Sequence, residues 1–121
     1  MGAFSIIVEY ETVTGGEAGF CALMCEHARR TLDDEPGCLR FEVLRPIDDD
    51  GQPLARRFIV SALYADRTAF ATHRRTPAVK RLLTAMEPFV ATRRQTISRA
   101  VFPTEADDGL RPEELNAAND G

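Results

Sequence analysis

The sequence lacks an apolar run long enough to span a membrane, and no basic segment precedes the short apolar stretch near its N-terminus. Ile6 stands where an N-myristoylation signal needs Ser or Thr. These absences favour a soluble, cytoplasmic protein without membrane contact. The chain also has no excess of basic charge, since its formal net charge is −4, which argues against general binding to nucleic acid.

Cysteine is scarce, and an odd count of three without a signal peptide favours reduced thiols. Cys21 and Cys25 are four residues apart and would share one helix face, so with His27 they could be imagined as metal ligands. Zinc sites usually combine a closer cysteine pair with a second pair of ligands, and the sequence supplies no second pair. We therefore expect structural cysteines and no metal site.

A chain of 121 residues with 44% hydrophobic residues fits one domain with a substantial core. We place this domain at residues 3–102. From Pro103 onward the composition changes to Asp, Glu, Asn, Gly and Ala. Residues 103–121 are therefore predicted to form an acidic tail that is flexible or wraps onto a partner chain.

The first third of the chain predicts a strand followed by a long helix. Apolar and polar residues alternate from Phe4 to Tyr10, as in a strand with one apolar face. Helical spacing follows over about residues 17–34, with an apolar stripe that includes His27, and Glu35-Pro36-Gly37 ends the helix. A lone histidine in such a stripe is either a core residue or a site residue, and both interpretations stay open.

Three further strands are predicted. Alternation resumes over residues 39–43, and a polar loop centred on Asp50-Gly51 leads to a strand over about 57–64. That strand is apolar on nearly both faces, which favours a central position with cover on both sides. A last strand over about 92–102 has the poorest alternation.

The stretch from Tyr64 to Pro77 predicts two short helices. Asp66 is a good N-cap for the first, and a hydroxyl cap followed by proline, Thr76-Pro77, starts the second. Phe70 and His73 are three residues apart and share one face of the first helix. His73 is therefore placed either as a base in a pocket or as an ordinary half-buried histidine.

The predicted order is β-α-β-β-α-β, with the second helix broken in two. This order indicates an α+β, ferredoxin-like fold with a four-stranded antiparallel sheet and helices on one face. The other face of the sheet needs a cover. A second copy of the chain would supply it, so we expect a homodimer.

Several of these residues, in this order, resemble a known family. They are Glu35-Pro36-Gly37-Cys38-Leu39-Arg40-Phe41, Tyr64-Ala65-Asp66, Ala69-Phe70, His73, and Thr76-Pro77 with Lys80. The set is similar to the antibiotic biosynthesis monooxygenase domain, which includes small quinol monooxygenases and proteins of the autoinducer-2-degrading type. The resemblance covers roughly residues 4–102 and implies a dimeric α/β barrel.

The resemblance also implies a chemistry. Oxygenases of this type use no metal, haem or flavin: a phenol or quinol loses a proton in an apolar pocket, and its anion reacts with oxygen. The protein then supplies a base and donors that stabilise the anion. His73 and His27 are the candidate bases, since only histidine titrates near neutral pH without a large shift. Candidate substrate contacts are Tyr64, Phe70, Arg40 and Phe41, with Tyr64 orienting an oxygen and Arg40 offsetting negative charge.

Two positions depart from the family pattern. Many relatives continue Thr-Pro with His, where this chain has Ala78, and many carry Glu two residues before the tyrosine, where it has Ala62. The haem-degrading branch of this fold generally relies on a tryptophan, and this chain has none. These differences bear on activity rather than on the fold.

Two other functions stay open. The first is an isomerase or lyase that shuttles protons on a small carbonyl compound, with Arg74, Arg75 and Lys80 at the pocket mouth. The second is a non-catalytic dimer that binds a small apolar ligand, which the alanines at positions 62 and 78 would favour. A cofactor-independent oxygenase acting on a small aromatic molecule is the leading hypothesis.

Overall fold

The computed structural model describes residues 2–102, so the predicted tail over 103–121 lies outside the described residues. The elements are β1 (Phe4–Thr12), α1 (Glu17–Asp34), β2 (Cys38–Leu44), β3 (Arg57–Tyr64), α2 (Arg67–Arg74), α3 (Pro77–Met86), the 3-10 helix η1 (Glu87–Phe89) and β4 (Val90–Arg99). Their order confirms the predicted β-α-β-β-α-β sequence of elements. No helix in this part of the chain is long and apolar enough to cross a membrane.

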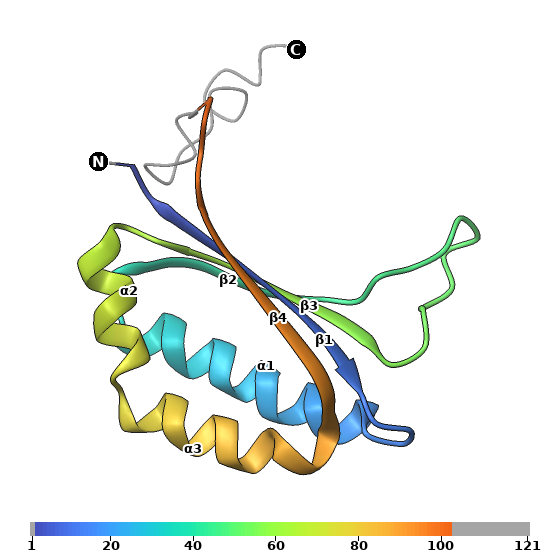
Figure 1. Ribbon diagram of the computed structural model, residues 1–121. Coiled ribbons are helices and arrows are strands. Elements are labelled where there is room, and N and C mark those ends of the chain that lie inside the picture. The colour runs from blue at the N-terminus through green and yellow to red at the C-terminus, as the bar shows by residue number, and fades with distance from the viewer. Residues whose placement is uncertain (1, 103–121) are drawn as a thin grey trace.

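The four strands form one antiparallel sheet in the order β2-β3-β1-β4. All three α-helices lie on one side of this sheet (Figure 1). The α+β ferredoxin-like prediction is therefore confirmed, and β3 is one of the two central strands. Within residues 2–102 the expected second cover of β3 is incomplete, because Ile59 and Ser61 on the helix-free face are only half-buried.

The predicted limits of the last strand were wrong. β4 runs over Val90–Arg99 rather than over 92–102. Its pairing with β1 begins where Thr12 lies opposite Val90 and ends where Phe4 lies opposite Arg99. Because Phe4 is the first residue of β1, residues 100–102 have no strand residues left to pair with, and the ladder stops.

The core lies between the helix-facing side of the sheet and α1. Phe20 of α1 is fully buried, with its ring centroid 4.8 Å from that of Tyr10 and 4.7 Å from that of Phe58. Met24, one turn further along α1, is 2% exposed. The apolar stripe predicted for this helix is therefore the face that packs on the sheet, and His27 lies on it.

The predicted starts of α2 and α3 are both confirmed. The Asp66 carboxylate accepts a hydrogen bond of 2.8 Å from the Ala69 backbone N–H. The Thr76 hydroxyl accepts one of 3.3 Å from the Val79 N–H, with a proline at the start of α3. The chain therefore turns between α2 and α3, directly after His73.

Gly37 allows α2 to lie close to the end of α1. A Cβ atom added at Gly37 would lie 2.6 Å from the Cβ atom of Ala69, closer than side chains can pack. The Gly37 carbonyl also accepts a hydrogen bond of 2.8 Å from the Ala65 N–H at the end of β3. Glu35, two residues before this contact, is thereby brought beside α2.

Candidate active site

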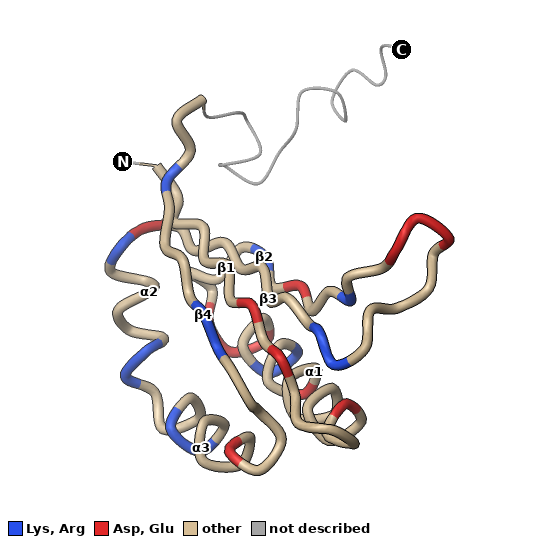
Figure 2. The backbone as a smooth tube through the Cα atoms, turned by 45° about the vertical axis from the view of Figure 1, so that its right-hand side comes forward, with Lys and Arg blue, Asp and Glu red and all other residues tan. Residues whose placement is uncertain are grey.

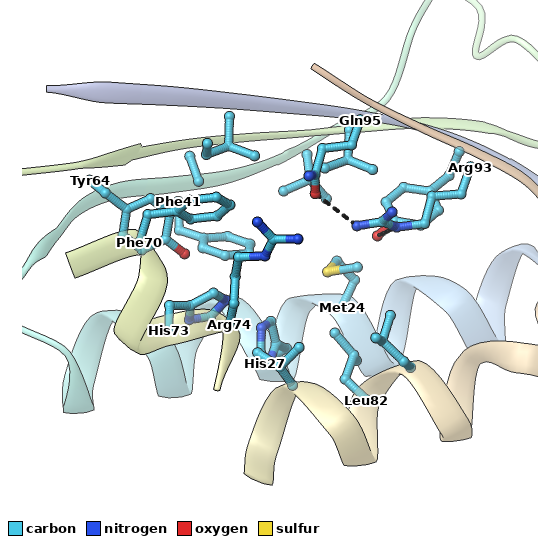
Figure 3. Close-up of a pocket in the computed structure, with 17 residues that line it drawn as sticks. Met24, His27, Phe41, Tyr64, Phe70, His73, Arg74, Leu82, Arg93 and Gln95 are labelled. Carbon is cyan, nitrogen blue, oxygen red and sulfur yellow. Dashed lines mark hydrogen bonds between the residues drawn. The ribbon is translucent and has the colours of Figure 1, made fainter. Parts of the chain in front are cut away.

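A pocket of about 360 Å³ lies between the helix-facing side of the sheet and the three helices (Figure 3). This volume is in the range of small-molecule sites. Most of its wall is apolar and comes from β1, β3 and α3, with contributions from Ile6, Val8, Val60, Val79, Leu82 and Leu83. Among the described residues that line it, none is Asp or Glu.

The two histidines, 46 positions apart in the chain, meet at this pocket. His27 comes from α1 and His73 from α2, and their ring centroids are 5.4 Å apart. Both are nearly buried, with 7% and 8% of their surface exposed. Both side chains line the same pocket, so both can contact the same bound molecule.

Three of the four predicted substrate contacts surround the histidines. The Tyr64 ring lies 5.3 Å from the ring of His73 and 5.3 Å from that of Phe70. The Phe41 ring meets His27 edge-on at 5.7 Å. All three aromatic residues line the pocket.

Arg40, the fourth predicted contact, does not line the pocket. It is exposed and lies 4.0 Å from the carboxylate of Glu42. Successive side chains of a strand point to opposite faces, and Phe41 points toward the helices, so Arg40 points to the helix-free face. Strand alternation therefore separates it from the histidines.

His73 has a partner that the sequence analysis did not identify. Its Nδ1 atom lies 2.9 Å and 3.1 Å from the two carboxylate oxygens of Glu35. A carboxylate only accepts hydrogen bonds, so Nδ1 carries the proton and Nε2 of the neutral ring is left as an acceptor. The sequence analysis interpreted Glu35-Pro36-Gly37 as a helix end and as part of the family resemblance, and it assigned Glu35 no role in the site.

The environment of His27 and Tyr64 favours their neutral forms. Burial, then the nearby His73 and Arg30, lowers the pKa of His27 to about 4. Burial, then the neighbouring Cys38 and Glu35, raises the pKa of Tyr64 above its ordinary value. At neutral pH the His27 ring is therefore uncharged, and the Tyr64 hydroxyl keeps its proton and can donate it in a hydrogen bond.

Two arginines bring positive charge to the pocket. Arg74 of α2 lies with its guanidinium carbon 5.2 Å from the centre of the Phe70 ring. Arg93 of β4 donates from Nη2 to Gln95 Oε1 at 2.9 Å and from Nε to the Tyr10 hydroxyl at 3.4 Å. Figure 3 shows the two side chains entering the pocket from different elements, with Arg93 at the end away from His73.

Arg93 and Gln95 were missed because the alternation of the last strand is weak. Both side chains belong to the helix-facing side of the sheet, since Tyr10 pairs with Arg93 and Val8 with Gln95. The distribution of charge along the sequence could have indicated that basic residues gather in this part of the chain. Residues 67–99 contain eight Lys or Arg residues and one acidic residue, Glu87, although the whole chain is acidic.

The two alanines that depart from the family pattern differ in position. Ala62 lines the pocket and is 2% exposed, whereas Ala78 is not among the lining residues. An acidic side chain at position 62 would therefore project into the pocket, and alanine leaves an uncharged wall there. Residue 78 does not line the pocket, so the alanine there does not change the pocket wall.

Cys21 and Cys25 lie apart from the pocket. The Sγ atoms of Cys21 and Cys25 are 3.8 Å apart on α1, and neither residue lines the pocket as His27 does. Within residues 2–102, no group of three or more His, Cys, Asp or Glu residues is arranged to hold a metal ion.

Comparison with known proteins places the fold. Two solved structures named "putative antibiotic biosynthesis monooxygenase" are similar: one from Nitrosomonas europaea (24% identity, TM-score 0.73, 86% of this chain and 96% of that chain) and one from Caulobacter crescentus (24%, 0.72, 83% and 91%). Protein SO0527 from Shewanella oneidensis is also similar (18%, 0.70, 82% and 91%). No curated protein matches the chain.

A family model gives the assignment that these distant structures cannot give at such low identity. The model described as "Antibiotic biosynthesis monooxygenase" matches residues 3–85, which is well over half of the chain. The matched segment includes both histidines, Glu35, Tyr64 and Arg74 but ends before β4. The chain belongs to the antibiotic biosynthesis monooxygenase family.

Proposed function

We propose that the protein is a cofactor-independent monooxygenase that oxidises a small phenol or quinol, with His73 as the general base. The main support is the contact between His73 and Glu35 at the edge of an apolar pocket. A histidine held by a carboxylate in this way has a fixed tautomer, and its free nitrogen can accept a proton. Family membership is consistent with an oxygenase.

In the proposed reaction, His73 Nε2 takes the proton of the substrate hydroxyl. The imidazolium that forms keeps its Nδ1–H bond to Glu35, whose negative charge offsets the new positive charge. The electron-rich phenolate then adds dioxygen at a ring carbon that carries hydrogen, giving a hydroperoxide once a proton is returned. Loss of water from the hydroperoxide leaves a carbonyl, so one oxygen atom enters the product and the other leaves as water.

The other residues at this end of the pocket would stabilise and orient the anion. The protonated Tyr64 hydroxyl is the proposed donor to the substrate oxygen, and the Arg74 guanidinium beside Phe70 opposes its charge. His27 is neutral at pH 7 and can exchange hydrogen bonds with the substrate without adding charge. Phe41 and Phe70 would pack against the aromatic ring of the substrate.

The experiment is oxygen uptake by metal-stripped protein with a panel of hydroquinones, catechols and polycyclic phenols. We expect uptake above the autoxidation blank for at least one compound, at about one dioxygen per substrate consumed, as the proposed stoichiometry requires. Labelled dioxygen should place one labelled atom in the product and one in water. Uptake that disappears on removal of metal, or label found in water alone, would contradict the proposal.

A homodimer through the helix-free face of the sheet remains our proposal. Leu44 is 42% exposed there, and Ile7 and Ile59 are half-buried. A second sheet packed on this face would bury these apolar side chains. Ile59→Lys should therefore convert a dimer into monomers, measured by light scattering after size-exclusion chromatography. A wild-type protein with the mass of one chain would rule out this arrangement.

The arginines at the pocket also favour the second candidate, a proton-shuttling isomerase or lyase acting on a polar carbonyl compound. Arg75 and Lys80, which that function would use, lie outside this pocket, whereas Arg74 lines it. The largely apolar wall suits an aromatic substrate better. Exchange of substrate hydrogen with heavy water in the absence of oxygen would favour the isomerase instead.

A further inference from the structure

We infer that the substrate of this pocket carries an acidic group, a carboxylate or sulfonate, on the part of the molecule remote from His73, and that Arg93 and Gln95 bind it. The inference deepens the proposed function by naming a substrate class, and it rests on that function only for the identity of the reacting end. The observation behind it is an arginine held at the far end of an apolar pocket by neutral partners alone.

The strand pairing separates Arg93 from the histidines. Tyr64, whose ring lies beside His73, pairs with Phe4 at one end of the sheet. Near the other end, Tyr10 of β1 pairs with Phe58 of β3 on one side and with Arg93 of β4 on the other. Tyr64 and Phe58 are six positions apart along β3, which corresponds to about 20 Å of backbone at 3.3 Å per residue. Arg93 therefore enters the pocket from the end opposite His73, as Figure 3 shows.

Arg74 is placed to offset the charge of an anion formed beside His73. It lies on α2 next to His73, with its guanidinium over the Phe70 ring that packs against Tyr64. Figure 3 shows His73, Tyr64 and Phe70 together at one end of the pocket and Arg93 at the other. Arg93 is exposed at its end of the pocket, so this second positive charge is placed to meet a second negative group on the ligand.

The neighbours of Arg93 leave donors free. Its two hydrogen bonds go to Gln95 Oε1 and the Tyr10 hydroxyl, both uncharged, and within residues 2–102 it makes no ion pair. A guanidinium has five N–H donors arranged for two-pronged binding of a carboxylate or sulfonate. Gln95 fixes the orientation of the fork, so less side-chain freedom is lost when the ligand binds.

The distribution of charge over the rest of the molecule also favours an anionic ligand. Lys and Arg mark α2, the start of α3 and the middle of β4, whereas Asp and Glu gather on α1, β1 and the β2–β3 loop (Figure 2). The elements α2, α3 and β4 contain no acidic residue at all. A positive potential on this side of an acidic protein attracts anions to the pocket and disfavours cations.

The test uses two fluorescent probes with the same ring system. One is 8-anilinonaphthalene-1-sulfonate, and the other is N-phenyl-1-naphthylamine, which lacks the sulfonate. We expect wild-type protein to bind the anionic probe about tenfold more tightly, as a partly exposed charge-assisted contact would give. Arg93→Gln should remove most of this preference and leave the affinity for the neutral probe within about twofold, since the apolar wall is unchanged.

The matched control is Arg94→Gln. It removes the same charge from the next residue of β4, which lies on the opposite face of the sheet and does not line the pocket. We expect it to leave the preference for the anionic probe intact. An equal loss of the preference in Arg93→Gln and Arg94→Gln would mean that the probe is attracted only by the overall positive charge. Equal weakening of both probes by Arg93→Gln would mean that Arg93 only maintains the structure of the pocket. Either result overturns the inference.

The same measurement separates this inference from the proposed function, because neither probe needs to react with oxygen. Tight and equal binding of both probes would overturn the acidic-group requirement and leave the oxygenase proposal standing. A clear preference for the anionic probe, without oxygen uptake on any acidic phenol, would support the acidic-group inference and contradict the oxygenase proposal. Failure of both probes to bind would overturn the substrate class itself.

Discussion

Replacing His73 by glutamine should lower the turnover number by a factor of about 10²–10⁴, the usual contribution of a general base. Glutamine is similar in size and can still reach Glu35, but it has no nitrogen that accepts a proton at neutral pH. The measurement is oxygen uptake at saturating substrate, with the fold checked by circular dichroism. The Michaelis constant should change little, because the apolar wall that holds the ring is untouched.

Thr72→Ala is the matched control for this variant. Thr72 precedes His73 on α2, is exposed, and does not line the pocket. Its turnover should stay within about twofold of wild type, as for most exposed substitutions away from a site. Full activity of His73→Gln would remove His73 from the mechanism and leave His27 as the remaining histidine candidate.

Glu35→Gln separates the charge of Glu35 from its hydrogen bond. The amide oxygen can still accept from His73 Nδ1, so the tautomer is retained, but the charge that offsets the imidazolium is lost. Turnover should fall by about tenfold or more, because a charge-assisted bond becomes a neutral one. A purely structural role would instead appear as reduced stability with unchanged turnover in the folded fraction.

The sequence predicted the elements of this fold because their signals are local. The Asp66 and Thr76 caps, the alternation of β1 and the stripe of α1 each depend on a few neighbouring residues, and the structure confirms them. β4 was the exception. It is an edge strand, and most of its side chains are exposed on both faces, so selection for alternation is weak.

The arrangement of the site was less predictable. The contact between His73 and Glu35 joins residues 38 positions apart and depends on how closely α2 approaches the end of α1 at Gly37. The spacing of apolar and polar residues along the sequence carries no information about such a long-range contact. Arg40, in contrast, could have been placed from sequence, because it directly precedes Phe41 in one strand and the two cannot share a face.

Lowering the pH from 7 to 5 should cost the protein about 2 kcal/mol of unfolding free energy through His27 alone. The pKa of His27 is about 4 in the folded state, against an ordinary value of 6.5. Between these values the unfolded chain binds a proton at this residue and the folded chain does not. Stability is therefore fully present above pH 6.5 and is lost progressively as the pH falls toward 4.

His27→Leu isolates this contribution, since leucine fills a similar volume in the stripe of α1 and does not titrate. Urea unfolding at pH 7 and pH 5 should show a loss smaller by about 2 kcal/mol in the variant, whatever its stability at pH 7. Carboxylates contribute equally to both proteins and cancel in the difference. Equal losses in the two proteins would mean that His27 takes up a proton in the folded state near its ordinary pKa. It would then be charged beside His73 in mildly acidic solution and could not serve as the neutral partner in the proposed reaction.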